Sequence, residues 1–318
     1  MAEPIIESIE EYGLSKKKKN SSKLFSKVGV VGCGCDGQYI ARVCSSYGLE
    51  VIFKETSQNQ IDESLHKIAS IMDGRIKNWG ATESEKKAVM SRISTTTDLR
   101  DFKDCDLVIE TMPTAGKGRN FETRKNVFEE LEKIVDRHCI LATNSTTVII
   151  SDLVENLMHK DRCISIHFMI NSFDSRIVEI TKGLYTADWA YQKVKQFIQM
   201  TNRKVIPVEE SVGLVSVRMF CVILNEACEM LLEGVGSKDD IEQLMKTGYG
   251  MRLGPFTIAD VMGLDRVTRW MENLFNEFGD SRYKTNPMIK RLLRQHNYGV
   301  SSGSGFYTYN EKDEKING

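Results

Sequence analysis

Short apolar runs alternate with stretches of helical periodicity through the first two thirds of the chain. A short run rich in Val and Ile is typical of a buried strand, whereas apolar positions three or four residues apart are typical of an amphipathic helix. Strands that alternate with helices predict an α/β fold with a mainly parallel, doubly wound sheet. The predicted strands cover residues 27–31, 50–53, 106–109, 140–142, 163–166, 177–180 and 204–208, and the predicted helices cover 38–47, 58–72, 84–90, 121–135 and 187–200.

The pattern changes near residue 213, where long strands give way to helical periodicity over 215–232, 238–246, 256–262 and 267–278. We therefore expect an N-terminal extension over 1–26, an α/β domain over 27–210 and an all-helical domain over 211–318. The apolar faces of the last domain exceed what its own helices would bury, because each has few partners. This excess predicts a homodimer formed through the helical domain.

Composition narrows the class of protein. The 318 residues carry a net charge of -1, which gives no reason to expect a nucleic-acid partner. The apolar runs are shorter than the roughly 18 residues that a membrane span needs, and the N-terminus lacks the plan of a signal peptide. Eight cysteines occur without a C-x-x-C pair. We interpret them as free thiols of a reducing cytoplasm and expect no metal site.

A glycine motif joins the first predicted strand to the first predicted helix. Gly32, Gly34 and Gly37 form a G-x-G-x-x-G, which in this setting binds the pyrophosphate of a dinucleotide at a helix N-terminus. Glu55 ends the second strand, where an acid accepts hydrogen bonds from the ribose hydroxyls. Its charge would repel a 2′-phosphate, so the sequence predicts NAD over NADP, although the neighbouring Lys54 weakens that preference.

Polar residues follow other strands of the predicted sheet. The hydroxyl-rich loop 143–147 follows one strand, and His167 follows another. If the strand that carries Glu179 is adjacent, its carboxylate can bind one imidazole nitrogen and leave the other as a general base. A buried His–Glu pair with a purely structural role is equally compatible with the spacing. Glu110 and Asn144 also follow strands, and we assign both to the cofactor site.

Two helices inserted after the second strand, over 58–72 and 84–90, form a predicted hairpin rather than an ordinary crossover. Lys77, Lys86 and Lys87 lie on this hairpin. They are either ordinary surface lysines or a clamp for the phosphates of a large, nucleotide-bearing substrate.

From Lys27 to Tyr309 the chain resembles the NAD-dependent 3-hydroxyacyl-CoA dehydrogenases. The matching stretches include VGVVGCGCDG, ISTTTDLRDFKDCDLVIE, ATNSTTV, HFMINSFDSRIVE and GVSSGSGFYTY. The resemblance implies a Rossmann domain followed by a helical dimerisation domain, and reversible oxidation of the 3-hydroxyl of a fatty acyl-CoA with NAD.

The resemblance also implies roles for single residues. The catalytic His of the family falls on His167, and its partner Glu falls on Glu179. The substrate-contacting Ser of the family's S-N-T-S motif falls on Thr146, which keeps a hydroxyl. The lysine-rich hairpin that includes Lys77 corresponds to the region where the family holds the CoA nucleotide.

The chain departs from the family at positions that hold the substrate oxygen. The family reads H-F-F-N-P after its catalytic His, but here Ile170 takes the Asn position and the Asn has moved to Asn171. A second family Asn, near the substrate, is replaced by Val217. The remaining groups that could hold the 3-oxygen are Thr146, Ser145, Ser216 and His167. The loop 113–118 is also longer than its family counterpart.

Three functions are compatible with this combination. The first is an active 3-hydroxyacyl-CoA dehydrogenase, which is favoured by the retained His–Glu pair. The second is a dehydrogenase of the same fold that acts on another 3-hydroxy acid or thioester. The third is a catalytically impaired paralogue that binds NAD or acyl-CoA, which the loss of both amides would explain.

Overall fold

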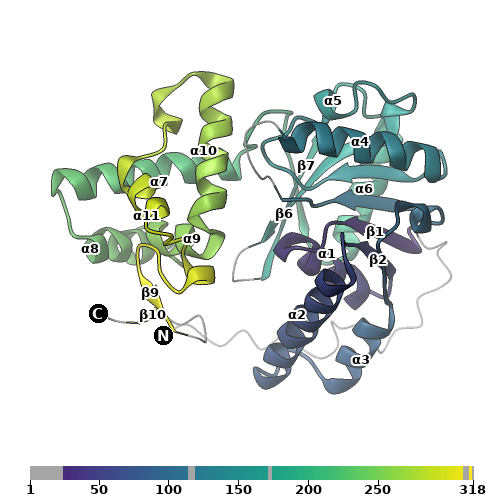
Figure 1. Ribbon diagram of the computed structural model, residues 1–318, viewed down its shortest axis with the longest axis horizontal. Helices are drawn as coiled ribbons and strands as arrows, with labels where there is room; N and C mark the ends of the chain where they lie inside the picture. Colours follow the sequence, from purple (N-terminus) through teal and green to yellow (C-terminus); the bar gives the residue numbers. More distant parts are fainter. Residues whose placement is uncertain (1–23, 114–118, 171–173, 311–314, 317–318) are drawn as a thin grey trace.

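The computed structural model describes residues 24–113, 119–170, 174–310 and 315–316. Figure 1 shows a sheet layered with helices in the first part of the chain, and a cluster of helices beside it in the second part. The extension over 1–23, most of the loop 113–118 and Asn171 lie outside the described residues.

The sheet has eight strands in the order β3-β2-β1-β4-β5-β6-β7-β8. The strands are β1 Lys27–Val31, β2 Glu50–Lys54, β3 Ile93–Thr96, β4 Leu107–Glu110, β5 Ile140–Thr143, β6 Cys163–Ile170, β7 Asp174–Lys182 and β8 Lys204–Pro207. The first six run parallel, and β7 turns back antiparallel to β6. The chain order reverses between β1 and β4, and ligands of open α/β sheets bind outside the strand ends at such a switch point.

The predicted α/β class is confirmed, with two differences of detail. The edge strand β3 was not predicted, because its sequence Ile-Ser-Thr-Thr is only partly buried and carries no apolar run. The hairpin strands β6 and β7 extend several residues beyond the predicted apolar runs, since backbone pairing continues into their polar ends.

Helices cover both faces of the sheet. They are α1 Cys35–Ser46, α2 Gln58–Lys77, α3 Glu83–Ser91, α4 Arg119–Ile134, α5 Ile150–Leu153 and α6 Asp188–Met200. Buried side chains of α1, α2 and α6 pack on one face, and those of α4 and α5 pack on the other. The helices α2 and α3 contact each other as the predicted hairpin.

The second part of the chain has its own core. Its helices are α7 Ser216–Glu233, α8 Lys238–Gln243, α9 Pro255–Met262, α10 Leu264–Phe278 and α11 Pro287–Arg294, and two short strands, β9 Thr308–Tyr309 and β10 Lys315–Ile316, pair near the C-terminus. Leu224, Phe256 and Met271 are fully buried in this core. No helix among the described residues is both long and apolar enough to span a membrane.

A buried carboxylate fixes the C-terminal tail to α9. Asp260 accepts hydrogen bonds from the backbone N–H groups of Phe306 and Tyr307 at 2.8 and 2.9 Å and from the Tyr309 hydroxyl at 2.9 Å. Burial raises the pKa of Asp260 to about 6, although these donors oppose the rise. The tail thereby holds α9 in place, and α9 contributes side chains to the cavity described below.

We predict that Gly29 of β1 and Phe102 are energetically coupled. A Cβ at Gly29 would lie 2.4 Å from the ring of Phe102, which is fully buried. Gly29→Ala should therefore destabilise the fold by about 1–3 kcal/mol through overpacking, and Phe102→Ala by about 3–5 kcal/mol through the cavity it leaves. In urea unfolding the double variant should lose less stability than the sum of the losses in the two single variants, because the alanine methyl fills part of the cavity left by the Phe102 ring. Strictly additive losses would contradict this packing.

Candidate active site

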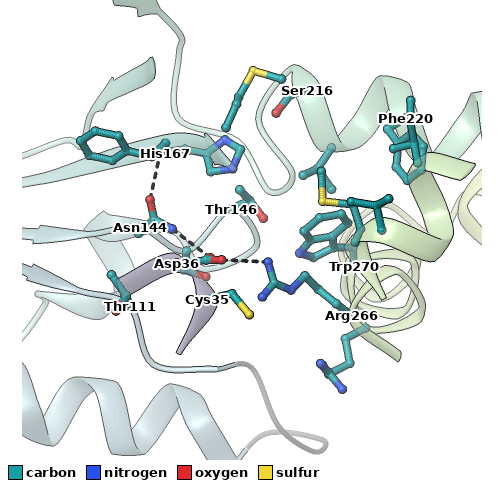
Figure 2. Close-up of a pocket in the computed structure, with 18 of the residues that line it drawn as sticks. Cys35, Asp36, Thr111, Asn144, Thr146, His167, Ser216, Phe220, Arg266 and Trp270 are labelled. Carbon is teal, nitrogen blue, oxygen red and sulfur yellow. Dashed lines mark hydrogen bonds and ion pairs between the residues drawn. The ribbon is translucent and has the colours of Figure 1, made fainter. Parts of the chain in front are cut away.

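A cavity of about 490 Å³ lies between the strand ends of the sheet and the helices of the second part. Figure 2 shows His167, Asn144 and Thr146 entering it from the sheet side, and Arg266, Trp270 and Phe220 from the helical side. The described lining residues are Gly34, Cys35, Asp36, Thr111, Met112, Pro113, Arg124, Asn144, Ser145, Thr146, His167, Phe168, Met169, Ser216, Val217, Met219, Phe220, Ile223, Met251, Arg252, Leu253, Ile258, Val261, Met262, Arg266, Arg269 and Trp270.

The glycine motif forms one wall of this cavity. Gly32 has a φ of +86°, which suits a turn that a residue with a side chain would strain. A Cβ added at Gly34 would meet no atom within 4 Å, so the backbone there is open to a ligand. A Cβ at Gly37 would lie 2.2 Å from the carbonyl oxygen of Gly32, so α1 can approach β1 only because Gly37 has none. This cradle fits the pyrophosphate of a dinucleotide.

Glu55 lies directly beside the motif, one residue beyond β2. Its Oε1 accepts a hydrogen bond from the backbone N–H of Cys33, which holds the carboxylate against the glycine turn. This placement suits an acceptor for the ribose hydroxyls of a bound dinucleotide. Burial raises the pKa of the Cys33 thiol to about 12, so this cysteine stays protonated and inert near neutral pH.

His167 and Glu179 face each other across the β6–β7 hairpin as directly paired residues. The imidazole Nδ1 lies 2.7 Å from Oε2 of Glu179. Oε1 of the same carboxylate accepts from the backbone N–H groups of Val215 and Ser216, at 3.2 and 3.0 Å, and the Ser216 hydroxyl donates to Oε2 at 2.7 Å. Adjacency of the two strands, on which the predicted pair depended, is therefore observed.

The electrostatics of this pair define the imidazole tautomer. Burial alone would raise the pKa of Glu179, but the hydrogen bonds from His167 and Ser216 and the charge of His167 lower it below its ordinary value. Glu179 is thus ionised at neutral pH and accepts the Nδ1–H of His167. The other ring nitrogen, Nε2, is left to accept a proton from a ligand in the cavity.

The hydroxyl-rich loop after β5 lines the cavity between the glycine motif and His167. The Asn144 side chain accepts from the backbone N–H of Phe168 at 3.0 Å and donates to Asp36 at 3.2 Å, as Figure 2 shows. Ser145 and Thr146 line the cavity beside it. The carbonyl of Thr146 accepts from the backbone N–H of Gly213 at 2.7 Å, which fixes the loop to the start of the helical part.

Six residues assigned to the site from the sequence do not themselves line this cavity: Gly32, Gly37, Glu55, Glu179, Glu110 and Lys77. The first four belong to the glycine motif and the His167 pair described above, whereas Glu110 and Lys77 have other surroundings. Glu110 is fully buried, and its carboxylate accepts from the Thr143 hydroxyl at 2.7 Å, from the N–H of Met112 at 2.6 Å and from Arg124. Glu110 therefore links the ends of β4 and β5 to α4. Lys77 is exposed in the last turn of α2, outside the set of lining residues.

Apart from Ser216 and Val217 at the start of α7, the helical side of the cavity was not predicted from the sequence. Apolar side chains from α7, α9 and α10, among them Phe220, Val261 and Trp270, face the strand ends. Their spacing along each helix is that of ordinary core residues, so no sequence signal separates them from the helical core. Val217 belongs to this apolar wall and is almost completely buried.

Two family models match the chain, and they meet where the α/β part ends and the helical part begins. The 3-hydroxyacyl-CoA dehydrogenase NAD binding domain matches residues 27–211, and the C-terminal domain of that family matches residues 213–309. The chain is 30% identical over 285 residues to a 3-hydroxybutyryl-CoA dehydrogenase of Clostridioides difficile, which covers 90% of this chain and all of that protein.

Solved structures of related proteins have the same fold as this chain. The (S)-3-hydroxybutyryl-CoA dehydrogenase PaaH1 from Ralstonia eutropha superposes with a TM-score of 0.79 at 30% identity, covering 90% of this chain and 100% of that one. FadB2 of M. tuberculosis gives a TM-score of 0.84 at 26% identity, with 90% and 99% covered.

The fold and the site therefore define an NAD-dependent oxidoreductase that acts on a CH–OH group. The chain belongs to the 3-hydroxyacyl-CoA dehydrogenase family. The predicted family, Rossmann architecture, activity class and NAD cofactor are confirmed.

We predict that alanine at two glycines of the motif affects two different properties, cofactor binding at Gly34 and stability at Gly37. Gly34→Ala should leave the melting temperature nearly unchanged but weaken NADH binding by about tenfold or more, because its methyl enters the space for the pyrophosphate. Gly37→Ala should instead lower the stability by about 1–3 kcal/mol, since its methyl meets the carbonyl of Gly32. Thermal unfolding and NADH fluorescence titration of both variants separate the two roles. Intact NADH affinity in Gly34→Ala would contradict the cradle.

Proposed function

We propose that this protein oxidises the 3-hydroxyl of an acyl-CoA reversibly, with His167 as the general base. The observation that carries the proposal is the His167–Glu179 pair, because its His167 lines the same cavity as Gly34 of the glycine motif, with Nε2 left to act on a ligand. A structural pair would have no need of a cavity on its free side.

Each protein group has one task in this reaction. NAD, when bound, supplies the acceptor for the hydride from the substrate carbon. His167 accepts the hydroxyl proton at Nε2 as the carbonyl forms, and returns it in the reverse direction. The ionised Glu179 retains the Nδ1 proton and stabilises the imidazolium that results. Glu55 and the glycine motif would hold the adenosine and pyrophosphate portions of NAD, and Asn144 fixes the strand beside His167 through the N–H of Phe168.

Thr146 is the group that we assign to the substrate oxygen, together with Ser145. Both line the cavity after β5. Ser216 also lines it, but its hydroxyl donates to Glu179, which makes positioning of the carboxylate its main role. We propose that Lys77 and its hairpin bind the CoA nucleotide. We also propose that Glu110 supports the cofactor site indirectly, by fixing the ends of β4 and β5.

The cavity wall and the related dehydrogenases both support a proposal for the kind of acyl group. Apart from Arg266 and Arg269 of α10, the helical side of the cavity is mainly apolar, with Phe220 and Trp270 among its side chains, and therefore suits a hydrocarbon tail. The relatives described above are named for 3-hydroxybutyryl-CoA. We therefore propose a short 3-hydroxyacyl-CoA as the substrate, and NADH consumption with acetoacetyl-CoA as the assay.

Val217 favours a second candidate function. It places an isopropyl group in the cavity wall, where the family has an amide, and so removes a hydrogen-bond donor from the substrate site. A pocket rebuilt in this way suits a different 3-hydroxy acid or thioester, or binding of NAD and acyl-CoA without efficient turnover. Comparison of acetoacetyl-CoA with free acetoacetate, alongside calorimetric NADH binding, distinguishes these functions.

We further propose a division into domains at 27–210 and 211–318, and a homodimer formed through the helical domain. The family models, which end at 211 and begin at 213, support this division. Leu232 of α7 and Val235, just after this helix, are more than half exposed, which supports a dimer surface at this end of the helix. All eight cysteines are free, and seven are buried, which supports a reducing cytoplasm.

We predict that His167→Ala lowers kcat by about 10²–10⁴-fold, the usual contribution of a general base, while NADH affinity stays unchanged. Glu179→Gln should lower kcat less, because an amide still contacts the ring. It should also lower the melting temperature, because one amide oxygen cannot replace both carboxylate oxygens, of which Oε1 accepts from the backbone N–H groups of Val215 and Ser216 and Oε2 accepts from the Ser216 hydroxyl. His138→Ala, an exposed histidine, is the control. Wild-type turnover in His167→Ala would refute the base assignment.

We predict that Thr146→Val raises the activation barrier reported by kcat/KM by about 2–3 kcal/mol, which lowers kcat/KM roughly 30–150-fold, because the site has few other groups that can hold the 3-oxygen. Steady-state kinetics with acetoacetyl-CoA measure this change.

We predict that Val217→Asn raises kcat with acetoacetyl-CoA by restoring an amide. Val217→Leu, which changes size but adds no amide, is the control. A lower melting temperature without a rate gain in Val217→Asn would support the second candidate function instead, since an unpartnered buried amide costs about 1–3 kcal/mol.

A further inference from the structure

An acidic residue lies within the phosphate-binding motif itself. Asp36 is the second residue of α1, directly before Gly37, and it lines the cavity. A carboxylate in the first turn is favourable for the free helix, because it faces the positive end of the helix dipole. It is unfavourable for a pyrophosphate, whose negative charge binds at the same helix end. Cofactor binding therefore requires that the charge of Asp36 be compensated.

Arg266 supplies that compensation from the other part of the chain. Its Nη1 lies 3.0 Å from Oδ1 of Asp36, although the two residues are 230 positions apart. Burial opposes the charge of Arg266, but the nearby Asp36 carboxylate outweighs it and raises the pKa of the guanidinium above its ordinary value. Arg266 is therefore charged at every physiological pH.

The ion pair lies on the side of the cavity where the cofactor binds. Figure 2 shows a chain of contacts that runs from Arg266 through Asp36 and Asn144 to the backbone beside His167. Asp36 is the hydrogen-bond partner of Arg266 within the described part of the chain. A guanidinium carries five N–H donors in a planar fork, so one contact with Asp36 leaves donors for a second anion in the cavity.

We propose that Arg266 is a cofactor-binding residue contributed by the helical domain, which neutralises Asp36 and donates to the pyrophosphate of NAD. The guanidinium then bridges the glycine motif and the cofactor. Because α10 supplies this group, NAD affinity depends on the contact between the two domains. The inference rests on the NAD site proposed above, and goes beyond it by assigning a phosphate contact outside the Rossmann domain.

A double-mutant cycle with two nucleotide probes tests the proposal. Arg266→Gln should weaken NADH and ADP-ribose by about 10–100-fold, because the pyrophosphate loses a contact and meets an uncompensated carboxylate. Adenosine, which lacks the pyrophosphate, should bind all variants alike. Asp36→Asn should bind NADH at least as tightly as the wild type. The double variant should recover at least threefold over Arg266→Gln yet remain weaker than Asp36→Asn.

Two further variants separate binding from folding. Arg266→Lys keeps the charge and should restore most of the affinity lost in Arg266→Gln. Arg282→Gln removes an arginine of the same domain that pairs with Asp280 outside the cavity, and should leave NADH affinity unchanged. Melting temperatures of all variants show whether each is folded at the temperature of the titration.

The outcomes are distinct. NADH and ADP-ribose affinities in Arg266→Gln equal to those of the wild type overturn the inference, as does equal weakening of adenosine. Weaker acetoacetyl-CoA binding with unchanged ADP-ribose binding also overturns it, and assigns Arg266 to the substrate instead. Failure of the wild-type protein to bind NADH would refute the cofactor site itself, and is thereby distinguishable from failure of this inference.

Discussion

One buried carboxylate holds the site together. Glu179 binds His167 on one side and the backbone and hydroxyl of Ser216, at the start of α7, on the other. Burying a carboxylate is costly unless its oxygens are well supplied with donors. The donors available here come from both the sheet and the helical domain. The charge is therefore stable only when the two domains meet correctly, and the same carboxylate that orients the His167 ring also contacts the start of the helical domain.

The cavity exists only because these domains meet. The sheet contributes the polar wall, which includes the glycine motif, Asn144, Thr146 and His167, because the parallel strands end at one edge. The helices contribute the apolar wall, which includes Phe220 and Trp270. A hydride transfer benefits from this division, because the apolar wall excludes water while the polar wall handles the charge and the proton. Both domains contribute residues to the lining of this space.

Val217, at which the sequence predicts a departure from the family, lies in the cavity wall and outside the His167–Glu179 pair. It is only one residue beyond Ser216, which contacts Glu179 through its backbone N–H and its hydroxyl. The catalytic geometry and the substrate surface can therefore diverge independently, even in adjacent residues of one helix. Asp36 is a comparable case in the cofactor site, since a charge that would oppose the ligand is paired by Arg266.

The sequence by itself determined the class of fold and the cofactor motif, and it predicted the pairing of His167 with Glu179 that the structure shows. These signals are local: Gly32, Gly34 and Gly37 act through their own backbone, and His167 and Glu179 lie on consecutive strands of a hairpin. Only the tertiary structure decided which side chains complete the site. Glu110 follows a strand at the cavity edge, as a cofactor ligand would, yet Thr143 and Arg124 engage its carboxylate beneath the site. Arg266 carries no signal in the sequence, because its contact depends on how α10 lies beside the start of α1, 230 residues away. Contacts between distant segments are set by the docking of whole domains, and no local pattern encodes that geometry.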